Sequence, residues 1–347
     1  MADEHGTIEL LMKGKQSVEL SVPVYINASA SIVGTKEGKG PLGDLFDFIG
    51  DDDMFGCETW EEAESSLQKD AAYMAIEKAG LSPKDIRYFF AGDLLGQSIA
   101  SSFGLAGYER PVFGIYGACS TCGEGLSLGT MAIAGGFAKN VLCVTSSHFA
   151  SAEKEFRFPL EYGSQRPLSA SWTVTGSGAY VLGKDKGIKS RGQITGFTTG
   201  KIIDYGLKDS MNMGACMAPA ACDTITEHLK DFNRTPEDYD RIITGDLGEV
   251  GRAALFRLLD DNGIDIQSKY MDCGIEMFDK ETQNTNAGGS GCGCAATVLS
   301  AYILRKIEEK TWHRVLFVPT GALLSKTSFN EGQSVPGIAH GVVIENV

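Results

Sequence analysis

The sequence predicts an α/β protein made of two similar halves, and two observations carry this prediction. The segment 82–94 recurs without a gap at 235–247, which indicates a duplicated unit. Helix-like and strand-like segments alternate in both halves, which favours βαβ units and mostly parallel sheets. We therefore expect a duplicated fold of five layers, in which two similar mixed-sheet halves, residues 1–200 and 201–347, surround buried central helices.

The two copies of the repeat predict the same local structure. Ser82 and Thr235 can each cap a short helix that begins with proline and carries an acid in its first turn. A short apolar strand follows in each copy, and a Gly-Asp pair then turns the chain out of that strand.

Local signals predict the other elements in chain order. Thr59 and Glu62 form a capping box that begins a helix, and Gly80 ends this helix. Small residues dominate the segments after Cys119 and after Asn286, which predicts two buried helices. The remaining predicted elements are a buried strand at 111–116, strands at 141–145 and 315–320, a helix at 221–232, and extra residues of the second half at 273–291.

The composition excludes several classes of function. The formal net charge is −14, and a surface this acidic repels nucleic acid and anionic lipid. No apolar run reaches the length of a membrane span and no secretory signal is evident, so we expect any membrane role to be peripheral. The nine cysteines are odd in number and several lie in apolar segments, which predicts buried thiols in a reducing compartment.

Three segments resemble the thiolase and β-ketoacyl synthase superfamily. Tyr-Gly-Ala-Cys-Ser at 116–120 is similar to the nucleophile turn of these enzymes. Thr-Gly-Ser-Gly-Ala at 175–179 resembles their Asp-Gly-Ala-Gly-Ala strand, with Thr175 in place of the Asp, and 284–289 resembles their Asn-x-Asn-Gly-Gly segment. The resemblance implies a duplicated thiolase-like five-layer fold.

Longer strings resemble the stage V sporulation protein AD family over nearly the whole chain. This resemblance implies a non-catalytic spore protein that binds dipicolinic acid, with or without calcium, and supports its transport into developing spores and spore germination. It further implies a homodimer, other stage V sporulation A membrane proteins as partners, a peripheral place on the spore inner membrane, and no cofactor. The strings are Lys-Glu-Gly-Lys-Gly-Pro-Leu-Gly at 36–43, Ala-Gly-Asp-Leu-Leu at 91–95, Phe-Arg-Phe-Pro-Leu-Glu-Tyr-Gly at 156–163 and Pro-Gly-Ile-Ala-His at 336–340.

Cys119 is the candidate nucleophile, because a thiol at a helix N-terminus gains from the helix dipole, which lowers its pKa. Acyl transfer also needs a base, usually histidine. By the resemblance, that histidine would follow 284–289 or lie at 244–246, and neither place holds one; Thr320 stands near the place of the second catalytic cysteine of thiolases. The alternative function is an acyl-transferring or condensing enzyme that uses Cys119, with His148 or His340 as the base.

A dicarboxylate ligand requires cationic or N–H donors. Arg157 and Arg166 can each bind a carboxylate through two nitrogens. Stacking on a pyridine ring is open to the nearby aromatics Phe156, Phe158, Tyr162 and Trp172. In the alternative interpretation, the segment is a dimer contact and its arginines pair with acids. The full set of candidate ligand-binding residues is Cys119, His148, Arg157, Arg166, Asn286 and His340.

Two further hypotheses concern metals and scaffolding. Cys119 and Cys122 could bind zinc together with Cys292 and Cys294. Cysteines that begin small-residue helices are also typical of tight packing, and we expect no metal site. A purely structural scaffold for membrane partners is the third candidate function, and it predicts that substitutions near Cys119 leave spore loading unchanged.

Overall fold

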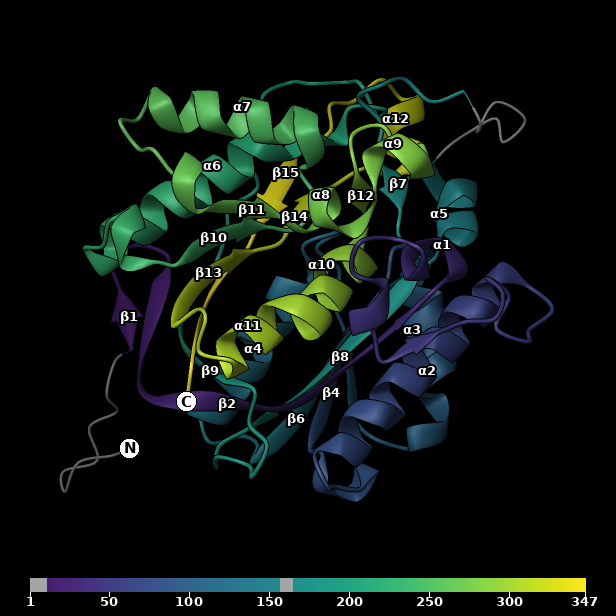
Figure 1. Ribbon diagram of the computed structural model, residues 1–347, viewed down its shortest axis with the longest axis vertical. Coiled ribbons are helices and arrows are strands. Elements are labelled where there is room, and N and C mark those ends of the chain that lie inside the picture. Colours follow the sequence, from purple (N-terminus) through teal and green to yellow (C-terminus); the bar gives the residue numbers. More distant parts are fainter. Residues whose placement is uncertain (1–10, 157–164) are drawn as a thin grey trace.

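One continuous sheet runs through the whole molecule in the computed structural model, which describes residues 11–156 and 165–347 (Figure 1). Two short strands, β1 (Met12–Lys13) and β3 (Phe48–Ile49), pair only with β2. The other strands follow the order β11 (Tyr270–Asp272), β10 (Arg241–Thr244), β13 (Arg314–Val318), β16 (Gly341–Glu345), β9 (Gly192–Thr198), β2 (Ser17–Val33), β8 (Gly176–Gly183), β6 (Asn140–Ser147), β4 (Tyr88–Gly92) and β5 (Val112–Gly114).

The duplication is visible in this strand order. In the first half, β2 pairs antiparallel with β8 and β8 with β6, and the pairs β6–β4 and β4–β5 are parallel. In the second half, β9 pairs antiparallel with β16 and β16 with β13, and the pairs β13–β10 and β10–β11 are parallel. The antiparallel pair β2–β9 joins the halves. This topology groups β9 with the second half, whereas the predicted division at 200/201 assigns it to the first.

Helices lie in three layers around this sheet. α2 (Trp60–Lys78) and α3 (Ile99–Leu105) cover the first half, and α6 (Met213–Phe232) and α7 (Gly248–Asp260) cover the second, at opposite ends of the view in Figure 1. α4 (Thr121–Ala134) and α10 (Cys292–Val298) contact each other and both pack on the sheet as the central layer. A π-helical turn, η8 (Leu299–Ile303), continues α10 into α11 (Leu304–Glu308). With the part of the sheet in each half counted as one layer, this is the mixed five-layer fold predicted from the sequence, which is confirmed.

Shorter elements connect these layers. The short helices are α1 (Thr35–Gly38), α5 (Phe149–Phe156), α8 (Cys273–Met277), α9 (Lys280–Gln283) and α12 (Lys326–Asn330), with single turns η1 (Gly43–Leu45), η3 (Gly96–Ser98), η4 (Ala106–Tyr108) and η7 (Gln267–Lys269). Two small ladders pair β7 (Trp172–Thr173) with β12 (Gly289–Ser290) and β14 (Thr320–Ala322) with β15 (Gly337–Ala339).

The elements with strong local signals form as predicted. Thr59 and Glu62 make the reciprocal capping box at the start of α2. In the two repeat copies, η2 (Pro83–Asp85) and η6 (Pro236–Asp238) are capped in the same way and lead into β4 and β10. The extra residues of the second half form α8, α9 and β12, between β11 and α10.

Two predictions about single elements were wrong. The helix predicted at 221–232 begins at Met213, because the side chain of Asn212 caps it and it continues through Pro219. The strand predicted as buried at 111–116 is β5, an exposed strand at the edge of the sheet. An apolar run does not distinguish a central strand from an edge strand, since both are rich in the same residues.

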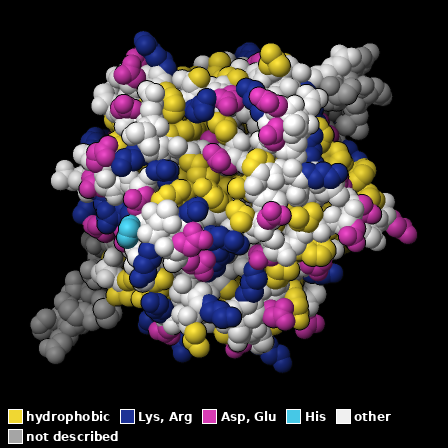
Figure 2. Space-filling view, viewed as in Figure 1, with side chains coloured by type: hydrophobic (Ala, Val, Ile, Leu, Met, Phe, Trp, Pro, Cys, Tyr) yellow, Lys and Arg dark blue, Asp and Glu magenta, His cyan; other side chains and the backbone are white. Residues whose placement is uncertain are grey.

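Acidic and basic side chains lie interspersed over the face shown in Figure 2, with apolar side chains gathered near its centre. Across the described ranges, no helix is both long and apolar enough to span a membrane.

Candidate active site

Cys119 lies in the tight turn between β5 and α4, as the sequence predicts. Ala118 adopts a left-handed conformation, with φ of 51°, and the hydroxyl of Thr121 donates to its carbonyl at 2.6 Å. The hydroxyl of Ser120 closes the same turn by donating to the carbonyl of Gly117 at 2.6 Å. Gly321 approaches this carbonyl so closely that any side chain there would collide with it. The turn is therefore held by its own side chains and by a glycine of the second half.

The groups around the thiol are acidic or neutral. The Sγ of Cys119 lies 3.8 Å from the hydroxyl of Ser290, which donates to the carboxylate of Asp246 at 2.7 Å. The same carboxylate accepts from the backbone N–H of Gly291 at 3.1 Å and from the hydroxyl of Thr320 at 2.8 Å. Asp246 and Cys119 are both buried. This cluster draws on three separate segments of the second half.

The thiol is held in its protonated form. Burial, and next the carboxylate of Asp246, raise the pKa of Cys119 well above its usual range. This is the opposite of the lowered pKa that a helix N-terminus predicts. A buried thiol beside an acid loses more from desolvation and repulsion than the helix dipole returns.

The cavity next to Cys119 is small. Its volume is about 30 Å³, which is enough for about one water molecule. Its walls come from both halves of the chain and contain a single charged residue, Glu153; the described lining residues are Leu94, Ala118, Cys119, Ala152, Glu153, Ser171, Thr173, Met213, Ser290, Gly291, Ala322 and Leu324. No histidine is among them.

His148 is engaged elsewhere. Its ring is fully buried; Nδ1 accepts from the backbone N–H of Ala150 at 3.1 Å, so the proton resides on Nε2, which donates to the carbonyl of Asp53 at 2.7 Å. The ring lies 5.4 Å from that of Trp60, and burial lowers its pKa. Both nitrogens therefore serve local structure, and the ring is not part of the cavity wall.

His340 also binds the backbone. Its Nδ1 accepts from the N–H of Gly200 at 3.3 Å, in the loop between β15 and β16. Burial lowers its pKa to about 4, so the ring is neutral at pH 7. Like His148, it does not line the cavity beside Cys119.

Arg166 and Asn286 lie close to the rim of the cavity. The guanidinium of Arg166 donates to Glu153 at 2.8 Å, and Glu153 is part of the cavity wall. The amide of Asn286 donates to the carbonyl of Pro167 at 3.2 Å, which ties it to the residue after Arg166. Arg157, Phe158 and Tyr162 lie outside the described residues.

Two cations contact the ring of Trp172 at the same rim. The ammonium of Lys36 lies 3.9 Å from the centre of its indole ring and the guanidinium of Arg166 lies 4.1 Å from it. Both contacts are within the range of cation–π attraction. The neighbours of Trp172 in the chain, Ser171 and Thr173, line the cavity. Two cations therefore gather at this rim, and one of them, Arg166, is ion-paired with Glu153.

Sequence reasoning missed Asp246 and Lys36 as site residues. It treated Asp246 as a turn residue of the repeat, although the turn 244–246 is where the resemblance placed the histidine of ketoacyl synthases. That correspondence was the available signal. For Lys36 we find no signal beyond its place in a family-like string.

The nine cysteines form no disulfide in the structure. All nine are free, and eight of them are buried, Cys57 being the exception. Within the described ranges, no group of three or more His, Cys, Asp or Glu side chains is arranged to hold a metal ion.

Comparisons with known proteins agree on one family. The family model for stage V sporulation protein AD matches residues 14–345. The stage V sporulation protein AD of Bacillus subtilis (strain 168) is 43% identical over 334 residues, which cover 96% of this chain and 98% of that protein.

Solved structures of much lower sequence similarity show the fold alone. Human mitochondrial 3-ketoacyl-CoA thiolase, in complex with CoA, aligns over 95% of this chain and 99% of its own, with a TM-score of 0.57 and 14% identity. The 3-oxoacyl-[acyl-carrier-protein] synthase III of Aquifex aeolicus VF5 covers 93% and 100%, with a TM-score of 0.55 and 14% identity.

Proposed function

This chain belongs to the stage V sporulation protein AD family, and on that premise we propose that it binds dipicolinic acid without transforming it and supports loading of this ligand into developing spores. The observation that carries the non-catalytic part is the surroundings of Cys119. Its polar neighbours are Ser290 and Asp246, and the described cavity wall contains no histidine. Acyl transfer requires a thiolate and a base, and this cluster favours neither.

The rim beside Trp172 is the place we propose for the ligand. Dipicolinate carries two carboxylates on an aromatic ring, and Arg166 and Lys36 supply cations beside the aromatic ring of Trp172. The space behind, next to Cys119, has room for about one water molecule, so the ring of the ligand would remain at the rim. Arg157 as a second carboxylate partner stays a prediction, as do contacts from His148, Asn286 and His340.

Isothermal titration calorimetry of the full chain with dipicolinate, with and without equimolar Ca²⁺, tests this function. We expect saturable binding that weakens at least tenfold in Arg166→Gln, because a charged hydrogen bond to a carboxylate is worth about 1.5–3 kcal/mol. Arg257→Gln is the matched control, since that side chain is exposed on α7. Absence of binding by the wild-type protein at millimolar ligand overturns the function, and unchanged affinity in Arg166→Gln overturns the assigned place.

A condensing or acyl-transferring enzyme remains the second candidate, because the left-handed turn that presents Cys119 is intact. Incubation with acetyl-CoA followed by intact-mass measurement separates the two functions. We expect no mass gain; an acetyl adduct that is lost in Cys119→Ala would establish the enzyme instead.

The same premise supports a homodimer. β5 leaves one edge of the sheet open, and Val112 and Phe113 on it are 44% and 52% exposed. Open edges of this kind pair with another strand or are blocked by charge. We expect Phe113→Lys to convert a dimer to a monomer in size-exclusion chromatography with light scattering, whereas Phe329→Lys on α12 leaves the mass unchanged. A monomeric wild-type protein contradicts the proposal.

Other stage V sporulation A membrane proteins are the partners that family membership suggests, with the chain placed peripherally on the spore inner membrane. Co-fractionation with spore inner membranes tests this location: release by high salt is expected, and recovery only in the soluble fraction contradicts it.

A further inference from the structure

A second cavity lies between the two halves and shares no lining residue with the one beside Cys119. Its volume is about 290 Å³, close to the lower limit for small-molecule sites. Its walls come from β2, the end of α2, the segment before β9, and the π-helical turn with α11; the described lining residues are Asn27, Ala28, Ser29, Leu45, Asp47, Lys78, Lys189, Arg191, Ser300, Ala301, Arg305 and Glu308.

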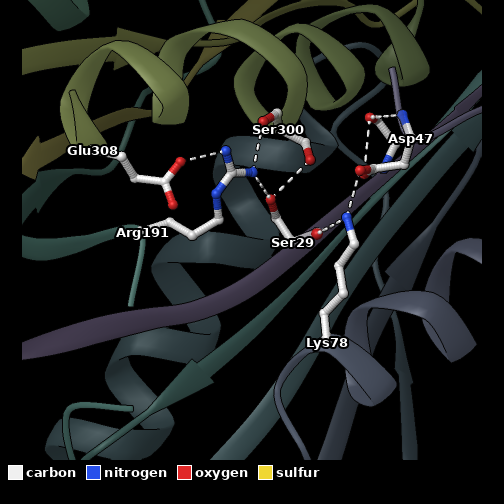
Figure 3. Close-up of polar contacts among 7 residues, drawn as sticks. Ser29, Asp47, Lys78, Arg191, Ser300 and Glu308 are labelled. Carbon is white, nitrogen blue, oxygen red and sulfur yellow. Dashed lines mark hydrogen bonds and ion pairs between the residues drawn. The ribbon is translucent and has the colours of Figure 1, made fainter. Parts of the chain in front are cut away.

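Arg191 lines this cavity and is held by three polar contacts (Figure 3). Its guanidinium donates to the hydroxyl of Ser29 at 2.6 Å, to the carbonyl of Ser300 at 2.8 Å and to Glu308 at 2.7 Å. Ser300 belongs to the π-helical turn, a feature that often marks functional sites in helices. The cation is therefore positioned before any ligand arrives.

Lys78 approaches the opposite side of Ser29 (Figure 3). Its ammonium donates to the carbonyl of Ser29 at 3.2 Å and pairs with Asp47 at 2.5 Å. Arg191 and Lys78 thus place two cationic centres on either side of one serine, each beside its own acid. A ligand with two separated negative groups matches this arrangement better than a single compact charge.

The charges of the cavity do not balance. Four cationic side chains line it, Lys78, Lys189, Arg191 and Arg305, against two acids, Asp47 and Glu308. Since Asp47 pairs with Lys78 and Glu308 with Arg191, Lys189 and Arg305 are the cations left over, and both are exposed. An excess of two positive charges is unexpected in a chain whose net charge is −14, and it attracts anions locally.

We propose that this cavity is a second binding site, which takes a small dicarboxylate. One carboxylate lies near Arg191 and Arg305 and the other near Lys78 and Lys189, and the hydroxyl of Ser29 lies between them. The proposal goes beyond the proposed function and does not depend on it, because it concerns other residues.

Calorimetric titration of the full chain with succinate tests the proposal. We expect saturable binding that weakens as salt is added, and at least a tenfold loss of affinity in the double variant Lys189→Glu/Arg305→Glu. Both side chains are exposed, so the variant should fold, which a thermal melt monitored by circular dichroism checks. The matched control is Lys15→Glu/Lys84→Glu, which makes the same charge change at exposed positions outside the cavity.

The variant Arg166→Gln separates this site from the rim of the first cavity. We expect Lys189→Glu/Arg305→Glu to cost the same succinate affinity in this background as in the wild-type protein. The proposal is overturned if succinate does not bind, if both double variants lose affinity equally, or if inorganic phosphate binds as tightly as succinate. Failure of the proposed function would instead appear as wild-type protein that binds succinate and not dipicolinate.

Discussion

The two Gly-Asp turns of the repeat have the same sequence, but their aspartates accept hydrogen bonds from different kinds of partner. Asp93 follows β4 and binds its own neighbourhood: its carboxylate accepts from the N–H of Leu95 at 2.9 Å and from the N–H and hydroxyl of Ser101 at 2.8 and 2.6 Å. Asp246 follows β10 and reaches across to Ser290 and Thr320 beside the thiol. One holds a helix start in place, whereas the other sets the chemistry of Cys119.

In the second half, Asp272 accepts the local backbone hydrogen bonds next to the repeat turn. Asp272 accepts from the backbone N–H of Leu247 at 2.9 Å and of Gly248 at 3.2 Å, next to the turn that Asp246 has left. The duplicated unit could therefore change the role of one aspartate because another residue satisfied the backbone donors. The lesson is that equivalent positions in a repeat predict equivalent backbone but not equivalent side-chain partners.

The largest effect is expected from Asp93→Ala. This change leaves three buried donors without their acceptor, and the free energy of unfolding should fall by about 3 kcal/mol. Urea denaturation followed by circular dichroism measures it. Asp85→Ala, which removes an exposed cap of η2, should cost much less. Equal losses in the two variants would show that the turn at Asp93 is not the structural one.

The free energy of unfolding should depend on pH through Glu64, the acid beside Asp93. Burial raises the pKa of Glu64 to about 8, and Asp93 adds to the shift. Unfolded glutamate titrates near pH 4.3, so between these values the native state binds more protons than the unfolded state. The stabilising contribution of Glu64 is complete below about pH 4, and it is lost progressively as the pH rises through 8.

We therefore expect the free energy of unfolding to fall between pH 6 and pH 9, by about 3 kcal/mol from Glu64 alone. Glu64→Gln should flatten this slope in urea titrations at each pH. Glu37, whose pKa burial also raises to about 8, leaves a residual slope in the variant. In the second half, burial raises the pKa of Asp272 only to about 6, so its contribution ends at lower pH. An unchanged slope in Glu64→Gln would contradict the assignment.

Thiol reactivity should separate the two aspartates more directly. Asp246→Asn removes the negative charge beside Cys119, and alkylation by iodoacetamide at pH 8 should accelerate by about tenfold, the effect of one pKa unit on the thiolate population. Asp93→Asn should leave the rate unchanged. Peptide mapping by mass spectrometry follows Cys119 specifically, and equal rates in both variants would remove Asp246 from its proposed role.

The smallest effect concerns the helix starts of the two halves. The hydroxyl of Thr59 accepts from the N–H of Glu62 at 3.2 Å within a complete capping box, whereas Asn212 accepts from Ala215 at 3.4 Å without a reciprocal bond. Thr59→Ala should cost about 1 kcal/mol and Asn212→Ala about half as much. Thermal melts compare the two variants, and a larger loss for Asn212→Ala would reverse the ranking.

Local chemistry could be predicted from the sequence, and long-range geometry could not. The capping box at Thr59, the repeat at Ser82 and the turn at Cys119 depend on residues within a few positions of one another, so they were predicted correctly. The partners of Asp246 lie 44 and 74 positions away, at Ser290 and Thr320, and no local pattern reports such a contact.

The histidines illustrate the same limit. His148 follows the end of β6, where its side chain could turn toward either side of the sheet, and packing against Trp60 and the Asp53 carbonyl decides the direction. The pKa of Cys119 was predicted in the wrong direction because helix position is readable from sequence, whereas burial and a distant carboxylate are not.

The single sheet has a mechanical consequence. β2 has 17 residues and pairs with β8 of the first half and with β9 of the second. The strand at the boundary of each half is therefore hydrogen-bonded to a strand of the other half. A polypeptide cut between residues 184 and 191 would separate β2 from β9 and leave each fragment with an unpaired edge strand. We expect such fragments to be insoluble alone and to reassemble when expressed together, and the intact protein to melt in one cooperative step.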